Sequence, residues 1–188
     1  SETAFKRIKT AAEETIRNYC FLKKVLEDVK HRYDYILIDC PPNLYTMTQN
    51  ALVASDYYII TTIPEYLSLI GLRTLIGKIK KIKEEIKNVA SLAGIELKFA
   101  ELGGIIFVKV RIGGSIVTNQ HNTNMTSIRE DKEIGQFCFK DYTTELIGYS
   151  EAAERRVPVW LCGTSNAQKA ANKSEYKNIT NEFLRRLP

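Results

Sequence analysis

The sequence of 188 residues predicts an α/β fold of three layers, in which a mostly parallel sheet has helices on both faces. Short apolar runs of strand length occur at residues 35–38, 57–63 and 103–110. The segments between them repeat apolar residues three and four positions apart, which predicts helices. The runs are continuous rather than alternating, and this is typical of parallel strands that are buried on both faces.

The first expected element is a helix over about residues 5–29. Its apolar stripe recurs every three or four positions, at Phe5, Ile8, Ala12, Ile16, Tyr19, Leu22, Leu26 and Val29. No glycine or proline interrupts this pattern. We expect a long helix, bent or straight, that delivers the chain into the first strand as a βαβ crossover does.

The most informative segment is the apolar run 35–38 together with the residues that follow it. Asp39 stands where the run ends, and Cys40-Pro41-Pro42-Asn43 comes next. Proline has no N–H for a strand ladder, so the chain must leave the sheet directly after Asp39. Ligands of open α/β sheets bind at the carboxyl ends of the strands. A carboxylate at this place can hold Mg²⁺, directly or through water, beside a phosphate.

Residues 48–56 predict a short helix, and residues 57–63 predict a second buried strand that Pro64-Glu65 closes. A long helix is expected from Tyr66 to about Ala90. Its lysines fall largely outside the apolar stripe, at Lys78, Lys80, Lys81, Lys83 and Lys87. They predict either a solvated helix face, partly balanced by neighbouring glutamates, or a surface that binds DNA or a partner protein.

The ordered motifs resemble the ParA family of deviant Walker-type ATPases, which partition plasmids and chromosomes. The resemblance is carried by Asp39-Cys40-Pro41-Pro42, Asn50-Ala51-Leu52-Val53-Ala54-Ser55-Asp56, Pro64-Glu65-Tyr66 and Leu69-Ile70-Gly71-Leu72. It is strong from Tyr33 to about Leu75 and looser towards the C-terminus.

This resemblance implies a P-loop NTPase-like fold, ATP and Mg²⁺ as cofactors, and a nucleotide-dependent homodimer. It also implies non-specific DNA binding, a centromere-binding ParB-like partner, no membrane contact, and a cytoplasmic, nucleoid-associated location. In the family pattern Asp39 lies in the Mg²⁺ shell, through water. Pro41, Pro42 and Asn43 open the switch loop that senses the γ-phosphate.

One departure from the family pattern concerns the phosphate-binding loop. The family loop is glycine-rich and ends in Gly-Lys-Ser/Thr, whereas residues 1–32 contain no glycine. No catalytic residue is therefore visible in this sequence. We expect either the C-terminal two-thirds of a ParA-like ATPase, incomplete at the N-terminus, or a relative that has lost the loop. The second alternative is a non-catalytic module that binds DNA or a protein.

After the third strand, residues 111–124 predict a loop and residues 125–136 a helix. Phe137-Cys138-Phe139 predicts a short edge strand, and residues 167–187 predict a closing amphipathic helix. In the family the segment around 144–159 approaches the adenine. Thr144-Glu145 stands there in place of the family's Pro-Arg pair, so no adenine contact is assigned.

The composition predicts one domain over residues 1–188. The net charge of +5 permits contact with an anionic partner without requiring it. The four cysteines are widely spaced and predict reduced thiols. His31 and His121 lack metal-ligand spacing, and we expect them on the surface or at helix caps.

Overall fold

The computed structural model describes residues 2–113, 116–145, 148–162 and 165–187. The chain divides into two compact units. The first consists of Ser1–Tyr58 with Thr74–Leu102, and the second of Ile59–Arg73 with Gly103–Pro188. The single domain expected over residues 1–188 stays a prediction. Within the described ranges, no helix is long and apolar enough to cross a membrane.

The first unit begins with a helical segment that is broken, as the sequence allowed. Its elements are α1 (Glu2–Tyr19), α2 (Phe21–Glu27) and a 3₁₀ turn, η1 (Lys30–Arg32). The amino-terminal part of the expected stripe is not buried, since Phe5 is 66% exposed. Further along α1, Ala12 and Ile16 are buried, so only this second half of the helix contributes to a core.

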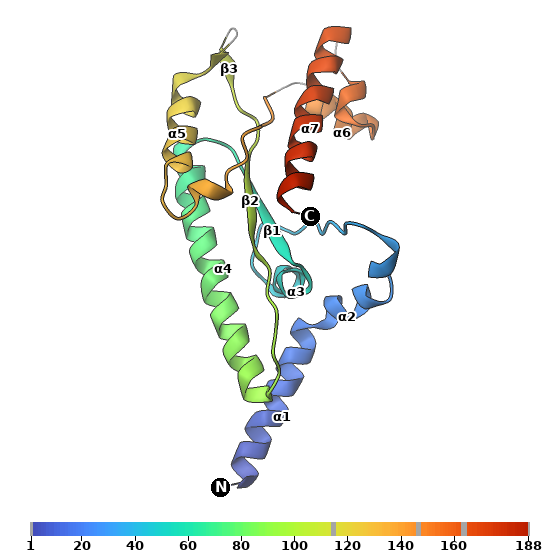
Figure 1. Cartoon of the computed structure of the whole chain (residues 1–188), viewed down its shortest axis with the longest axis vertical. Helices are drawn as coiled ribbons and strands as arrows, with labels where there is room; N and C mark the ends of the chain where they lie inside the picture. The colour runs from blue at the N-terminus through green and yellow to red at the C-terminus, as the bar shows by residue number, and fades with distance from the viewer. Residues whose placement is uncertain (1, 114–115, 146–147, 163–164, 188) are drawn as a thin grey trace. The chain divides into compact units, whose positions relative to one another are not determined.

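The strand expected at residues 35–38 is a wrong prediction. Residues 33–45 form a loop between α2 and α3 (Thr46–Ala54), drawn without an arrow in Figure 1. Leu37, in the middle of the apolar run, is 80% exposed. A parallel strand needs a neighbour to receive its backbone hydrogen bonds, and among the described residues no strand lies beside this run. The helix expected at 48–56 is confirmed by α3, which begins two residues earlier.

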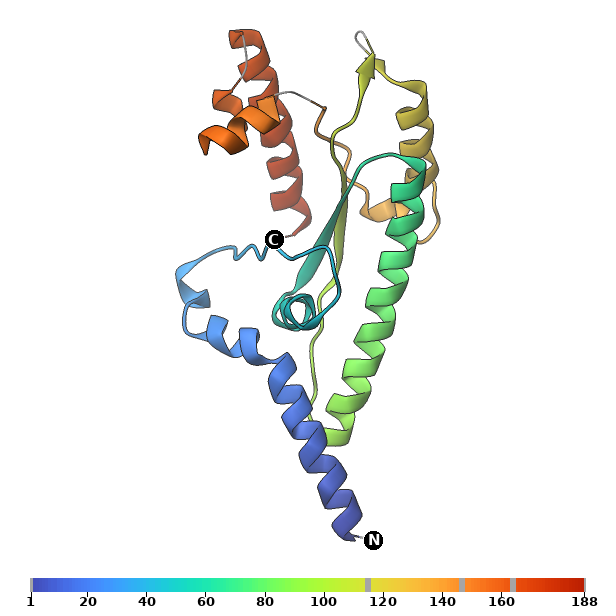
Figure 2. The ribbon, with the colours of Figure 1, turned by 180° about the vertical axis from the view of Figure 1, so that it is seen from behind.

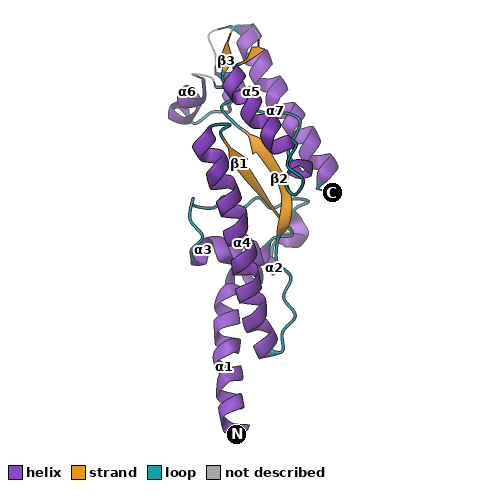
Figure 3. Cartoon of the chain, turned by 90° about the vertical axis from the view of Figure 1, so that its left-hand side faces the viewer, coloured by secondary structure: helices purple, strands orange, loops and turns teal. Residues whose placement is uncertain are grey.

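A β–α–β unit confirms the α/β class. It consists of β1 (Tyr57–Thr62), α4 (Tyr66–Ala93) and β2 (Glu101–Phe107), and Figure 3 shows the two strands side by side. The hydrogen bonds at both ends show that the strands are parallel. The N–H of Glu101 donates to the carbonyl of Asp56 at 3.0 Å, and that of Val108 to Thr62 at 2.9 Å.

Helix α4 ends because Gly94 turns the chain out of the helix. Gly94 has φ of 72°, in the left-handed region that glycine adopts without a Cβ penalty. The N–H of Ile95 then donates to the carbonyl of Ala90 at 2.9 Å, which satisfies one of the last carbonyls of the helix. The core around α4 in the first unit contains Ile16, Leu52, Val53, Ile79, Ile86, Ala90, Leu97, Phe99 and Ala100.

The rest of the second unit is more structured at 111–124 than the sequence predicted. An antiparallel pair, β3 (Ile112–Gly113) and β4 (Ile116–Val117), leads directly into α5 (Asn119–Arg129), visible in Figure 2. The helix expected at 125–136 therefore begins earlier and ends at Arg129. A 3₁₀ turn follows, η2 (Gly135–Phe137).

Residues 138–144 add a strand-like segment beside β2, so the edge strand expected at 137–139 is confirmed in part. The bridges Ile105 to Cys138 and Val110 to Thr144 are parallel. The N–H of Phe139 donates to Ile105 at 2.8 Å. The C-terminal elements are α6 (Gly148–Arg155), a 3₁₀ turn η3 (Val159–Leu161), and α7 (Asn166–Arg186), which confirms the closing helix.

Two carboxylates of α7 occupy the outer edge of this segment. Glu182 is buried and accepts the N–H of Lys140 at 2.9 Å and the N–H of Asp141 at 3.3 Å. Glu175 accepts both the N–H and the hydroxyl of Thr144, at 3.0 and 2.7 Å. Helix α7 thus satisfies backbone donors that a further strand would otherwise take.

Candidate functional site

The loop that the sequence singles out is exposed at Asp39, and hydrogen bonds of Asn43 hold it beyond that residue. Asp39, Pro41 and Pro42 are all exposed. The Cys40 thiol donates to the carbonyl of Ile38 at 3.8 Å. Partial burial, and then the neighbouring Asp39 carboxylate, raise the pKa of Cys40 above the usual range. This thiol is therefore protonated at neutral pH and is a poor nucleophile.

Asn43 closes the loop on the first turn of α3. Its side-chain Oδ1 accepts the N–H of Tyr45 at 3.2 Å, which is an Asx-type turn. The hydroxyl of Thr48 donates to the Asn43 carbonyl at 2.6 Å. The N–H of Asn43 in turn donates to the Pro41 carbonyl at 2.8 Å. Asn43 therefore has a clear structural role, and its place in a switch loop that senses the γ-phosphate stays a prediction.

The residues at Asp39 fit a nucleotide-bound Mg²⁺ but not a protein-only metal site. Among the described residues no three His, Cys, Asp or Glu side chains form a cluster that could hold a metal. Mg²⁺ keeps several waters and commonly takes only one or two carboxylates beside substrate phosphates. A lone exposed carboxylate suits that arrangement, in which phosphates and waters would supply the remaining ligands.

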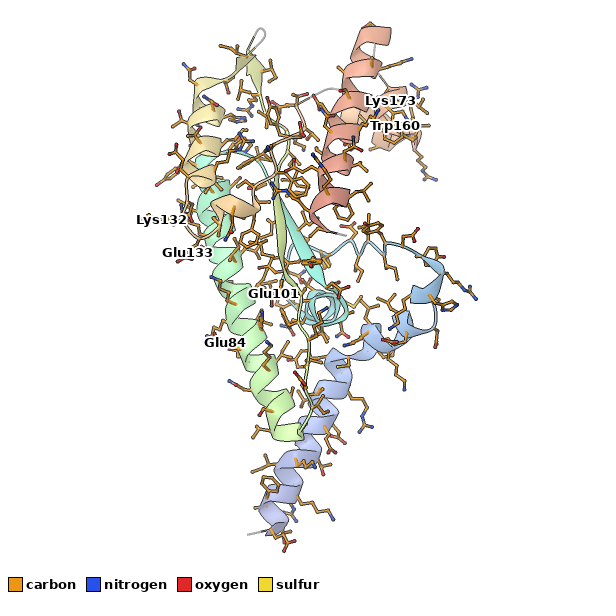
Figure 4. The ribbon with its side chains drawn as sticks, viewed as in Figure 1. Glu84, Glu101, Lys132, Glu133, Trp160 and Lys173 are labelled. Atoms are coloured by element: carbon orange, nitrogen blue, oxygen red, sulfur yellow. The ribbon has the colours of Figure 1, made fainter. Side chains whose placement is uncertain are left out.

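The five lysines of α4 do not form one continuous ridge. Spacings of three and seven place Lys80, Lys83 and Lys87 on one side of the helix, while Lys78 and Lys81 lie on another. Lys83 is half-buried and ion-paired with Glu101, the first residue of β2, which Figure 4 labels. Lys81 lies 3.9 Å from Glu85. These pairs agree in part with the solvated-face alternative.

A second cluster of charges, which the sequence analysis missed, lies where three parallel segments end. Glu65 follows β1, Arg111 follows β2, and Glu145 follows the segment 138–144. The Arg111 guanidinium lies 3.0 Å from the Glu145 carboxylate and 3.5 Å from the Glu65 carboxylate. The rule about strand ends that singled out Asp39 also applies to these three positions. The single guanidinium bridges two carboxylates from different segments, so we interpret the cluster as a clamp between strand ends.

The backbone beside this clamp is strained and tied to a buried histidine. Lys109 has φ of 53°, which is uncommon for a residue with a side chain. The N–H of Arg111 donates to Nδ1 of His121 at 3.0 Å, and His121 is buried. The expectation of a surface or capping histidine is therefore wrong at His121. Its spacing of four from Met125 and seven from Ile128 gave the available signal, because all three share one buried helix face.

Thr144 and Glu145, which stand where the family pattern has a Pro-Arg pair, both bond to other residues of this chain. Thr144 is bonded to Glu175, and Glu145 to Arg111. Residues 146–147, which follow them, lie outside the described residues.

Comparison with known proteins gives a consistent result. The AAA domain family (AAA_31) matches residues 1–92. The sporulation initiation inhibitor protein Soj of Bacillus subtilis is 41% identical over 83 residues, which are 44% of this chain and 33% of that protein. A ParA family protein of Chlamydia pneumoniae is 30% identical over 186 residues, which are 98% of this chain and 64% of that protein. The chain thus spans between a third and two-thirds of these relatives.

Solved structures agree on the fold. McdA from Cyanothece in a complex with ATP superimposes with a TM-score of 0.64 at 13% identity, over 92% of this chain and 61% of that chain. The apo form of McdA gives 0.61 at 15% identity, over 92% and 64%. At this identity the likeness establishes a P-loop NTPase-like fold. With the sequence relatives, which extend over nearly the whole chain, it leads to one conclusion: this chain belongs to the ParA/Soj family.

Proposed function

We propose that this chain supplies the switch loop and scaffold of a ParA-like partition ATPase that binds ATP with Mg²⁺. One observation supports this most directly. The family motifs occur in order and fall on consecutive elements, namely the loop with Asp39, then α3, β1 and the start of α4. We also propose that the complete fold has three layers, with helices on both faces of a mostly parallel sheet.

In this proposal Asp39 holds Mg²⁺ through water, and the bound metal neutralises charge on the nucleotide phosphates. Pro41 and Pro42 stiffen the loop, because proline restricts its own backbone and that of the preceding residue. Asn43 anchors the far end on α3. The loop can then be ordered by phosphate and metal and released after hydrolysis.

Calorimetric titration of Mg²⁺-ATP into the 188-residue chain tests this proposal. Binding that is lost in Asp39→Ala but kept in Asp34→Ala, an exposed acid of the same loop, would support it. Binding that both variants keep would remove Asp39 from the site. No binding by any variant would favour the second function below for this chain.

The second candidate function is a ParA-like module that binds DNA or a protein without hydrolysis. Two observations favour it. The sequence contains no glycine-rich segment ending in Gly-Lys-Ser/Thr, and the residues at the adenine-loop position are engaged in internal bonds. Activity of a longer protein that includes a phosphate loop would exclude it.

We propose further that the family's nucleotide-dependent homodimer, its ParB-like partner and its non-specific DNA binding apply to the whole protein.

The α4 lysines lie on two sides of the helix, which allows a matched DNA-binding test within one helix. Lys80→Gln with Lys87→Gln removes two charges from one side, and Lys78→Gln with Lys81→Gln removes two from another. If one side binds DNA, the loss of its two lysines should weaken binding and lower the salt dependence by about two counterions. If both variants bind DNA as tightly as the unsubstituted protein does, α4 is excluded as the DNA surface.

A further inference from the structure

Helix α2 begins without a cap of its own. Cys20 occupies the N-cap position and makes no side-chain capping bond. The first N–H groups of a helix have no partner within the helix, so something else must accept them. At α2 the acceptor comes from another helix, since the N–H of Leu22 donates to Oδ1 of Asn50 at 3.2 Å.

Asn50 is held so that it can serve as this acceptor. It is 7% exposed, and its Nδ2 donates to the carbonyl of Thr46 at 3.1 Å within α3. The buried residues Ala51, Leu52 and Val53 follow it and fix α3 in the core. Both ends of the Asn50 amide are therefore used, one inside α3 and one on α2.

The two residues that precede Asn50 bond the end of the switch loop. The Thr48 hydroxyl donates to the carbonyl of Asn43 at 2.6 Å, and Nε2 of Gln49 donates to the carbonyl of Leu44 at 2.7 Å. Three consecutive side chains of α3 thus join the loop on one side to α2 on the other. A rigid helix with bonds at both places moves as one body.

We propose that Asn50 is a positioning residue that couples the conformation of the Asp39–Asn43 loop to α2. A loop that shifts Asn43 shifts α3 through Thr48, and Asn50 carries that shift to the first turn of α2. The role of the loop as a nucleotide switch rests on the proposed function, but the coupling itself is a property of these bonds. It gives a physical reason for an asparagine at the first position of the Asn50–Asp56 motif.

Hydrogen exchange of the α2 amides tests the coupling without nucleotide, in a double-mutant cycle. Asn50→Ala should speed exchange at residues 22–24 about fivefold, as expected for a lost helix cap. Asn43→Ala, which removes the turn at the loop end, should speed exchange at the same amides in the native background. In the Asn50→Ala background it should add nothing.

Two further variants keep the proposal falsifiable. Asn50→Asp retains an acceptor for Leu22 and should restore slow exchange, whereas Asn88→Ala, on an exposed position of α4, should leave α2 unchanged. If Asn50→Ala does not fold, the comparison of α2 exchange between Asn43→Ala and Asn88→Ala decides the question alone. Additive effects of Asn43→Ala and Asn50→Ala, or no effect of Asn43→Ala on α2, would overturn the coupling. Failure of ATP binding would overturn the proposed function and leave this result standing.

Discussion

Residues 35–38 and β1 are similar in sequence and opposite in structure. Both are short runs rich in isoleucine and tyrosine, and each is followed by proline within a few residues. Ile60 of β1 is 9% exposed and its strand pairs with β2, whereas Leu37 is 80% exposed in a loop. The difference shows that strand character depends on an available neighbour as much as on the apolar pattern.

The largest expected difference between the two runs lies in hydrogen exchange. The amides of β1 that donate to β2 should exchange at least about a hundredfold more slowly than those of Ile36 and Leu37, because they open only with the fold. Exchange measured residue by residue checks this. Equal protection of both runs would mean that residues 35–38 pair in solution.

Charge substitution should separate the runs next most strongly. Ile60→Asp places a carboxylate in a buried position and should cost roughly 3 kcal/mol or more of unfolding free energy. Leu37→Asp should change it by less than about 0.5 kcal/mol, since the side chain is already in water. Urea denaturation of both variants measures the two losses of unfolding free energy. Similar losses would contradict the difference between the two runs.

A smaller effect is expected at high pH. Burial, and then the Glu101 carboxylate, raise the pKa of Tyr58 in β1 to about 12. A group with a raised folded pKa adds stability that is fully present below its unfolded value of about 10 and is lost as the pH rises through the folded value. Unfolding free energy should fall between these pH values, and Tyr58→Phe should flatten that fall. An unchanged slope in the variant would assign the loss to other groups.

The smallest effect is expected at the ion pair just before β1. Asp56 lies 2.6 Å from Lys98, and both side chains are exposed. Exposed pairs contribute little because water and salt screen them, so Asp56→Asn should leave the unfolding midpoint unchanged within error, as should Asp34→Asn in the loop. A clear fall in the unfolding midpoint for Asp56→Asn alone would mean that this ion pair, together with the hydrogen bonds to β2, keeps β1 in place.

The sequence predicted the elements whose signals are local. Helix α3, strand β1 and helix α4 follow from apolar spacing and from Pro64, and they have nearly the expected bounds. The run 35–38 failed as a strand because pairing depends on residues elsewhere in the chain. Helix α5 was placed too late, because its first turns are polar and its buried face includes His121.

The candidate site could be predicted only at Asp39, where an acid directly follows an apolar run. The clamp of Glu65, Arg111 and Glu145 joins residues up to 80 positions apart, and only the strand order brings them together. The hydrogen bond from Thr48 to Asn43 joins residues only five positions apart. It still could not be predicted, because a sequence motif does not show which atoms form hydrogen bonds.

The carboxylates of α7 have a consequence for assembly. Glu175 and Glu182 already take the outward N–H groups of residues 140–144, so that border of the sheet cannot template another chain. Growth of fibres by sheet extension past residues 140–144 is therefore disfavoured.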